Sequence, residues 1–209
     1  MLQYKWDNSL FFEYITMDRK LPVYKLVISD DLDNSGVFAI ALVDKPAIKT
    51  DWFAFKHEMK FAIQADRQIV TMPIMIADLP IYRRDNQRGE YYVLFEASEI
   101  EKIQQKFMMN DYLHNVNEMH DSKKKVEGVY LVNSFVSDEQ MGIKAPEMFK
   151  DLPNGTWFGS YKFTNKKYWD EMVKTGNFQA VSVEGIFDMV DEKKQLEKQI
   201  LDEVKNILS

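Results

Sequence analysis

The sequence predicts a strand-rich α+β fold, arranged as a barrel or a wrapped sheet. About eight segments show the period-two alternation or the β-branched and aromatic content typical of strands. Few helical segments lie between them, and the regular β–α–β alternation of a parallel sheet is missing. We therefore expect mainly antiparallel pairing around one core.

The composition is that of a soluble globular protein. Of its 209 residues, 45% are hydrophobic and 13% are aromatic, which is enough for a sizeable core. The formal net charge of −6 argues against a protein that coats nucleic acid, and no segment is long and apolar enough for a membrane helix. The chain has no cysteine and no glycine-rich nucleotide motif, so we expect no cofactor. From the charge and the hydropathy we expect no nucleic-acid and no membrane partner.

The N-terminal half contains five predicted strand segments. Pro73 interrupts one of them and cannot donate to a ladder, so that segment is expected to be an edge or a bulged strand. Residues 82–90 are polar and are predicted to form a loop, and residues 1–20 are predicted to be an appended arm. The five segments are 23–29, 37–44, 51–64 (one long strand or a hairpin), 69–78 and 91–97.

The C-terminal half mixes strands with three predicted helices. The first helix has Ser98 and Glu101 in a capping-box pattern, and the second has Thr164 as its N-cap and ends before Gly176. Residues 152–155 (LPNG) form a predicted turn. The predicted strands are 126–137, 156–163 and 177–188, and an amphipathic helix is predicted over 191–209. The chain thus divides into an arm (1–20), one domain (21–190) and a C-terminal helix (191–209).

Ser182 and Glu184 are polar residues inside an otherwise apolar strand. On a strand they share one face, while Val181 and Val183 point to the opposite face and into the core. A serine becomes a nucleophile when a base takes its proton, and histidine is the usual base. We therefore consider a pairing of Ser182 with a histidine, against the alternative of a solvated strand serine.

The chain has three histidines, which allow different roles. His57 lies in a strand-like segment and is interpreted as a surface residue. His114 and His120 lie close to Glu118, so a metal-dependent hydrolase that uses these three residues is one hypothesis. Their spacing matches no helical metal-binding motif, however.

Six motifs, in this order, resemble the phage prohead maturation proteases, of the type described as phage serine proteases. The resemblance spans about residues 22–188. The motifs are GVFAIALVDKPAI (36–48), HNVNEMHD (114–121), VYLVNSFVSD (129–138), LPNGTWFGSYKF (152–163), WDEMVKTGNF (169–178) and VSVEGIF (181–187).

The resemblance implies a fold related to herpesvirus assemblin, which is a small, mostly antiparallel β-barrel flanked by a few helices. It also implies a serine endopeptidase in which Ser182 is the nucleophile and His120 is the general base. Assemblin uses a second histidine downstream of the serine, but no histidine follows His120 here. Either an acidic residue takes this role or no third residue does, and among the acids Glu184 is favoured over Asp138 because it shares a face with Ser182.

The resemblance further implies where the protein works and on what. Such proteases cut scaffold and capsid proteins, and often themselves, inside the assembling procapsid in the host bacterial cytoplasm. A homodimer is expected because assemblins dimerise through helices. The alternative is a non-catalytic head or scaffold-associated protein that keeps the same fold.

Overall fold

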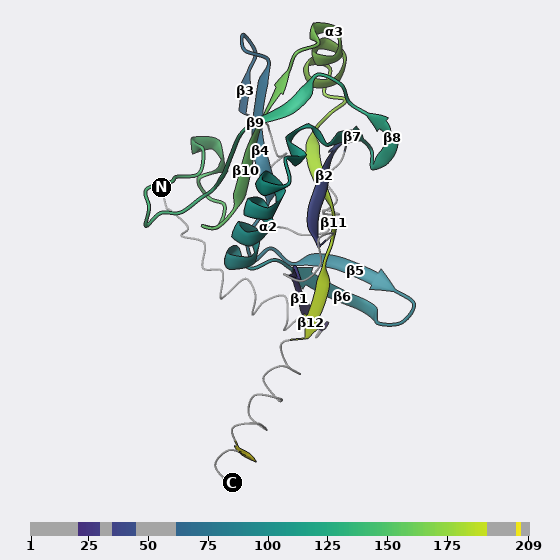
Figure 1. Cartoon of the computed structure of the whole chain (residues 1–209), viewed down its shortest axis with the longest axis vertical. Coiled ribbons are helices and arrows are strands. Elements are labelled where there is room, and N and C mark those ends of the chain that lie inside the picture. Colours follow the sequence, from purple (N-terminus) through teal and green to yellow (C-terminus); the bar gives the residue numbers. More distant parts are fainter. Residues whose placement is uncertain (1–20, 30–34, 45–61, 192–203, 206–209) are drawn as a thin grey trace, which may run out of the picture.

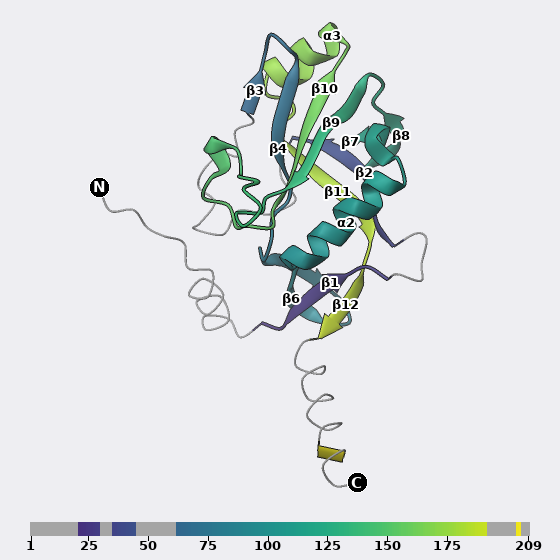
Figure 2. The same ribbon diagram turned by 60° about the vertical axis from the view of Figure 1, so that its left-hand side comes forward.

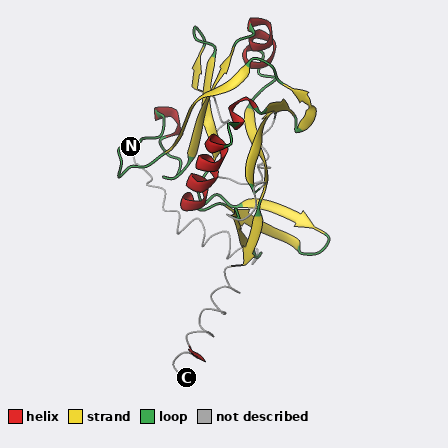
Figure 3. Cartoon of the chain, in the orientation of Figure 1, coloured by secondary structure: helices red, strands yellow, loops and turns green. Residues whose placement is uncertain are grey.

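The computed structural model of the chain describes residues 21–29, 35–44, 62–191 and 204–205. Within these residues, strands predominate and form three four-stranded sheets, so the strand-rich α+β class is confirmed (Figure 3). Seven of the nine strand pairs are antiparallel. The sheets do not close into the expected barrel, because each described sheet ends at two edge strands that pair with no other sheet.

The first sheet has the order β12-β1-β6-β5. Its strands are β1 (Val23–Val27), β5 (Ile81–Asp85), β6 (Gly89–Leu94) and β12 (Asp188–Asp191). β1 runs parallel to β6 and antiparallel to β12, so the two ends of the domain meet here. The loop predicted over 82–90 is wrong, because this polar segment forms most of the β5–β6 hairpin.

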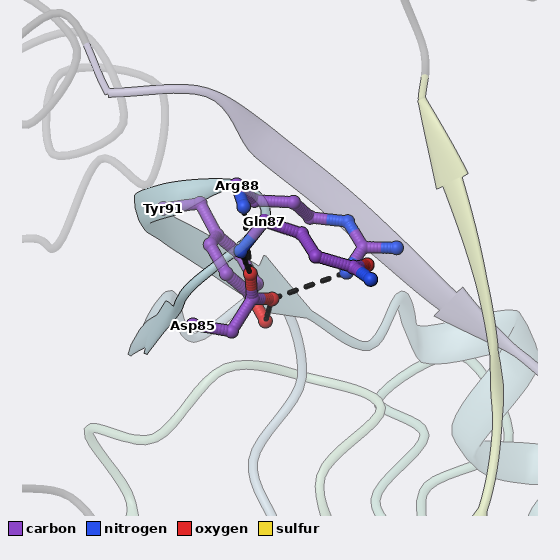
Figure 4. Close-up of polar contacts among 4 residues, drawn as sticks. All are labelled: Asp85, Gln87, Arg88 and Tyr91. Atoms are coloured by element: carbon purple, nitrogen blue, oxygen red, sulfur yellow. Dashed lines mark hydrogen bonds and ion pairs between the residues drawn. The ribbon is translucent and has the colours of Figure 1, made fainter.

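The turn of the β5–β6 hairpin is closed by one aspartate (Figure 4). Asp85 accepts backbone N–H bonds from Gln87 and Arg88, at 2.8 and 2.6 Å, and its second oxygen accepts from the Tyr91 hydroxyl and the Arg88 guanidinium. The backbone N–H of Arg88 is the main cause that lowers the pKa of Asp85 to about 2. Gly89, with φ of 73°, takes the left-handed position that the turn requires.

The second sheet has the order β3-β4-β10-β9. Its strands are β3 (Ala62–Gln64), β4 (Ile69–Met75), β9 (Val129–Val136) and β10 (Trp157–Phe163). β4 is a central strand, so the edge position considered for it is wrong, and the bulge is confirmed. The register shifts beside Pro73, where β4 meets the start of β10, and the bulge accommodates the missing N–H.

The third sheet has the order β11-β2-β7-β8 and carries the candidate site residues. Its strands are β2 (Gly36–Val43), β7 (Val116–Glu118), β8 (Asp121–Lys125) and β11 (Ala180–Ile186). β2 pairs antiparallel with β11 and parallel with β7. Strands β7 and β11, which are distant in the sequence, therefore lie on either side of β2.

Helix α2 (Ala97–Met109) packs between the second and third sheets, where it contacts β2, β9 and β10 (Figures 1 and 2). Its predicted apolar stripe is buried, as Ile100, Ile103 and Phe107 are each at most 1% exposed. The predicted capping box is wrong, because the helix begins at Ala97, two residues earlier than an N-cap at Ser98 implies, and its N-cap Glu96 makes no side-chain cap bond. Tertiary packing rather than capping fixes this end: the side chain of Glu99 accepts the N–H of Ile28.

The second helix is short and starts one residue later than expected. Asn165, not Thr164, is the N-cap, and its side chain accepts the N–H of Tyr168. Helix α3 (Lys166–Trp169) continues into a π-helical turn, η3 (Asp170–Lys174), and the chain leaves it before Gly176, as predicted. Two 3₁₀ turns complete the described elements: η1 (Tyr112–His114) and η2 (Glu147–Phe149).

Several predictions fall outside the described residues. These are the arm over 1–20, the strand or hairpin over 51–61, His57, and nearly all of the C-terminal helix. Asp191, where that helix was expected to begin, is the last residue of β12 instead. None of the described helices has the length and apolarity needed to span a membrane.

Candidate active site

Strand β11 presents Ser182 and Glu184 on one face. Val181 and Val183 point to the other face and pack against the main core, as the alternation predicted. In the ladder with β2, Ser182 is paired with Ala41 and Glu184 with Ala39. Both neighbours are alanines, so no long side chain of β2 stands between β11 and the strand beyond it.

That strand beyond is β7, and it brings in a further polar residue. Ala41 pairs with Asn117 on its other side, so Ser182, Ala41 and Asn117 form one row across three strands. Asn117 is 6% exposed. A row of paired residues shares one face of a sheet, so the amide of Asn117 lies on the face of Ser182 and Glu184.

The β7–β8 hairpin carries His120 to this face. Glu118 pairs with Asp121, which leaves a two-residue loop of Met119 and His120. Both have positive φ, 52° and 61°, the arrangement of a type I′ turn that normally favours asparagine and glycine. Side chains other than glycine adopt this conformation at a cost of roughly 1–2 kcal/mol per residue. The hairpin is held on β2 by the Met119 N–H, which donates to Leu42 O at 3.0 Å.

Glu184 connects β11 with β7 and with the β7–β8 turn. Its Oε1 lies 3.2 Å from Nδ1 of His120 and accepts a 2.7 Å hydrogen bond from Nδ2 of Asn117. The Glu184 side chain is 18% exposed and that of His120 is 42% exposed. An ionised carboxylate only accepts hydrogen bonds, so this contact is a hydrogen bond in the tautomer that carries the hydrogen on Nδ1 of His120. The other ring nitrogen, Nε2, is then free to act as a base.

The structure thus brings two of the three predicted site residues into contact. Ser182 lies two positions before Glu184 on the same face, and it is half-buried. Among the described residues, its hydroxyl makes no hydrogen bond with His120. Nucleophile–base contacts are often long in the absence of substrate, so this arrangement is compatible with an unliganded site.

Asp138, the alternative third residue, serves a local turn. Its carboxylate accepts the backbone N–H groups of Gln140 and Met141, at 2.9 and 3.1 Å, directly after β9. β9 belongs to the second sheet and not to the sheet of Ser182. The contact with His120 is therefore made by Glu184 and not by Asp138.

The three residues of the metal hypothesis have separate neighbours. The ring of His114 packs on Tyr130, with centroids 5.3 Å apart, and Glu118 accepts the hydroxyl of Tyr168 at 2.7 Å. Burial, followed by the bond to Glu118, raises the pKa of Tyr168. Within the described ranges, no group of three potential ligands is placed to hold a metal ion.

The sequence reasoning overlooked Asn117, whose one signal is its place three residues before His120 in the turn-forming segment.

The family model of the putative phage serine protease XkdF matches residues 62–191, which is more than half of the chain and includes His120, Ser182 and Glu184. Searches of curated proteins and of solved structures found no match. On the strength of the family match, the chain belongs to the family of the putative phage serine protease XkdF.

Proposed function

We propose that the protein is a serine endopeptidase in which Ser182 is the nucleophile, His120 the general base and Glu184 the group that orients the base. The observation that carries the proposal is the 3.2 Å contact between Glu184 Oε1 and His120 Nδ1, made two residues from Ser182 on the same face of β11. The family match supports the reaction class.

The chemistry assigns each proton. Ser182 Oγ attacks the scissile carbonyl carbon while its proton passes to Nε2 of His120, which gives a tetrahedral intermediate. The imidazolium then protonates the leaving amine, the C–N bond breaks, and water hydrolyses the acyl-serine through the same base. Glu184 keeps Nδ1 of His120 protonated throughout and stabilises the positive charge that develops on the ring.

The proposed substrates are the scaffold and capsid proteins of the assembling phage head, and the protease itself. The supporting observation is the membership of a phage serine protease family. Cutting inside the procapsid would take place in the host bacterial cytoplasm.

A fluorophosphonate probe tests the nucleophile without knowledge of the cleavage specificity. This class of probe forms a covalent bond with an activated serine, and mass spectrometry identifies the residue. We expect labelling at Ser182, with loss of labelling in Ser182→Ala and His120→Ala. Ser122, exposed on β8 close to His120, provides the control: Ser122→Ala should label like the wild type. Labelling that persists in Ser182→Ala contradicts the proposal, and a folded wild type that never labels or cuts favours the non-catalytic alternative.

The third residue is tested by a pair of matched variants. Glu184→Gln keeps the size of the side chain but no longer favours hydrogen on Nδ1 of His120, so cleavage of the scaffold protein should slow by about 10²–10⁴-fold. Asp138→Asn should leave the rate unchanged, because the Asp138 carboxylate is bonded within its own turn after β9. If Asp138→Asn slows cleavage and Glu184→Gln does not, the assignment of Glu184 is wrong.

A further inference from the structure

We propose that Asn117 is a positioning residue of the site: it fixes the Glu184 carboxylate so that His120 keeps its hydrogen on Nδ1 and presents Nε2 as the base. The inference rests on the proposed function and adds to it a group outside the serine, histidine and acid. Asn117 acts through Glu184 and touches no reacting atom.

The distances and burial give Asn117 the stronger hold on the carboxylate. Both Asn117 and His120 contact the same oxygen, Oε1 of Glu184, but the Asn117 bond is shorter, at 2.7 Å against 3.2 Å. Asn117 is 6% exposed and belongs to a strand paired on both sides. His120 lies in a two-residue turn, and its side chain is 42% exposed. The buried amide thus anchors the carboxylate, and the exposed imidazole aligns to it.

The chemistry of the amide determines its direction. If the amide were turned around, Oδ1 of Asn117 would face Glu184 Oε1, and two acceptors would meet at hydrogen-bond distance. The donor orientation is therefore the favoured one. It requires an acceptor on Glu184, which the ionised carboxylate supplies, and the ionised carboxylate in turn requires a donor from His120.

The other half of the amide indicates that Asn117 is present for more than stability. Its Oδ1 is buried and has no hydrogen-bond partner among the described residues. A buried unsatisfied acceptor destabilises a fold, and an apolar residue of the same size would avoid it. The bond that the Asn117 side chain does make goes to Glu184. The simplest reason for an asparagine here is the placement of that carboxylate.

Strand β2, which lies between β11 and β7, leaves room for the contact between Glu184 and Asn117. Ala39 and Ala41 of β2 stand opposite Glu184 and Asn117, respectively, and Ala41 is fully buried. Their side chains end at Cβ, so the Glu184 carboxylate can pass over β2 to reach the amide.

The test compares Asn117→Leu with Asn115→Ala. The leucine branches at the same carbon as asparagine, and its two methyl groups replace both the donor and the unpaired acceptor. The control residue, Asn115, is a neighbouring asparagine whose amide donates to the carbonyl of Phe38 and not to Glu184. Three quantities are measured on the full chain: the rate of fluorophosphonate labelling at Ser182, the thermal unfolding temperature, and the ¹⁵N chemical shifts of the His120 ring. The His120 signals are identified by their loss in His120→Gln.

We expect Asn117→Leu to label about 10–100-fold more slowly than the wild type, by analogy with the loss seen when groups that orient metal-ligating side chains are removed. Its unfolding temperature should be equal to that of the wild type or higher, because the unpaired Oδ1 is gone. Asn115→Ala should label at the wild-type rate. A purely structural asparagine would give the opposite pattern, with lower stability and an unchanged labelling rate. The ¹⁵N shifts should show hydrogen on Nδ1 in the wild type and a loss of this preference in Asn117→Leu.

The outcomes separate this inference from the proposed function. If the wild type labels at Ser182 and Asn117→Leu labels equally fast, the role of Asn117 is overturned and the serine protease stands. If the wild type does not label at Ser182, the proposed function fails first. Should Asn117→Leu not fold, Asn117→Ala gives the same comparison of rates. In addition, a wild-type His120 with hydrogen on Nε2 overturns the inference without any variant.

Discussion

The β5–β6 and β7–β8 hairpins have the same topology but opposite turn chemistry. The first turn has Asp85 at its start, bonded to the N–H groups that follow, and Gly89 at the left-handed position. The second turn has Met119 and His120 at left-handed positions that favour asparagine and glycine. One turn contains the residues that its geometry prefers, and the other does not.

The difference indicates what each hairpin is for. A turn that serves only to reverse the chain is free to use the residues that stabilise it best. Backbone strain on non-glycine residues persists where the surroundings impose it, and it is concentrated at functional sites. In β7–β8, the strained turn places the His120 ring on the carboxylate of Glu184. We interpret this turn as one in which stability is given up for the position of the imidazole.

The largest effect is expected from His120→Gly. Glycine adopts the positive φ of this turn without strain, so the fold should be retained. Loss of the base should slow substrate cleavage by about 10²–10⁴-fold. Cleavage rate and thermal unfolding are measured on the same sample. A variant that keeps the wild-type activity would show that His120 is not the base. A variant that unfolds would show that His120 is needed for stability rather than placed at the expense of it.

A smaller effect, of opposite sign in the two turns, is expected for backbone substitutions. Gly89→Ala forces a side chain into a left-handed position and should destabilise the protein by about 1 kcal/mol, although the space around it is open. Met119→Asn places a residue that tolerates this conformation, and should stabilise it by up to about 1 kcal/mol. Urea unfolding measures both changes. Equal signs would show that the two turns do not differ in strain.

The smallest effect concerns how the stability contributed by the β5–β6 turn depends on pH. The pKa of Asp85 in the folded protein, about 2, lies below the value of about 4 expected for an unfolded aspartate. A lowered pKa contributes stability above the unfolded value, and this contribution is lost as the pH falls from about 4 towards 2. The unfolding temperatures of the wild type and Asp85→Asn should therefore differ at pH 7 and converge near pH 2. A difference that stays constant with pH would exclude the charge of Asp85 as its cause.

The sequence predicted the parts of the fold that depend on local pattern. Alternation in β11 correctly separated the face of Ser182 and Glu184 from the core face of Val181 and Val183. Local pattern failed where tertiary context decides. Exposed charges along β5 resembled a loop, and a bulge allowed Pro73 into a central strand.

The site, like the fold, was predictable only in part from the sequence. The resemblance pointed to His120, and the shared face pointed to Glu184, so two members of the contact were named from the sequence. Asn117 was missed because its role depends on the register of three strands, which no local pattern contains. The open sheets in place of the expected barrel likewise follow from long-range pairing.

The central claim is that Glu184 orients His120 towards Ser182. The most direct measurement is a crystal structure of the protein with a phosphonate bound covalently to the nucleophile. The account predicts a bond from phosphorus to Ser182 Oγ, with His120 Nε2 about 3 Å from that oxygen and Nδ1 still on Glu184. A phosphonate on another residue, or a His120 ring that leaves Glu184 and does not reach Ser182, would contradict it.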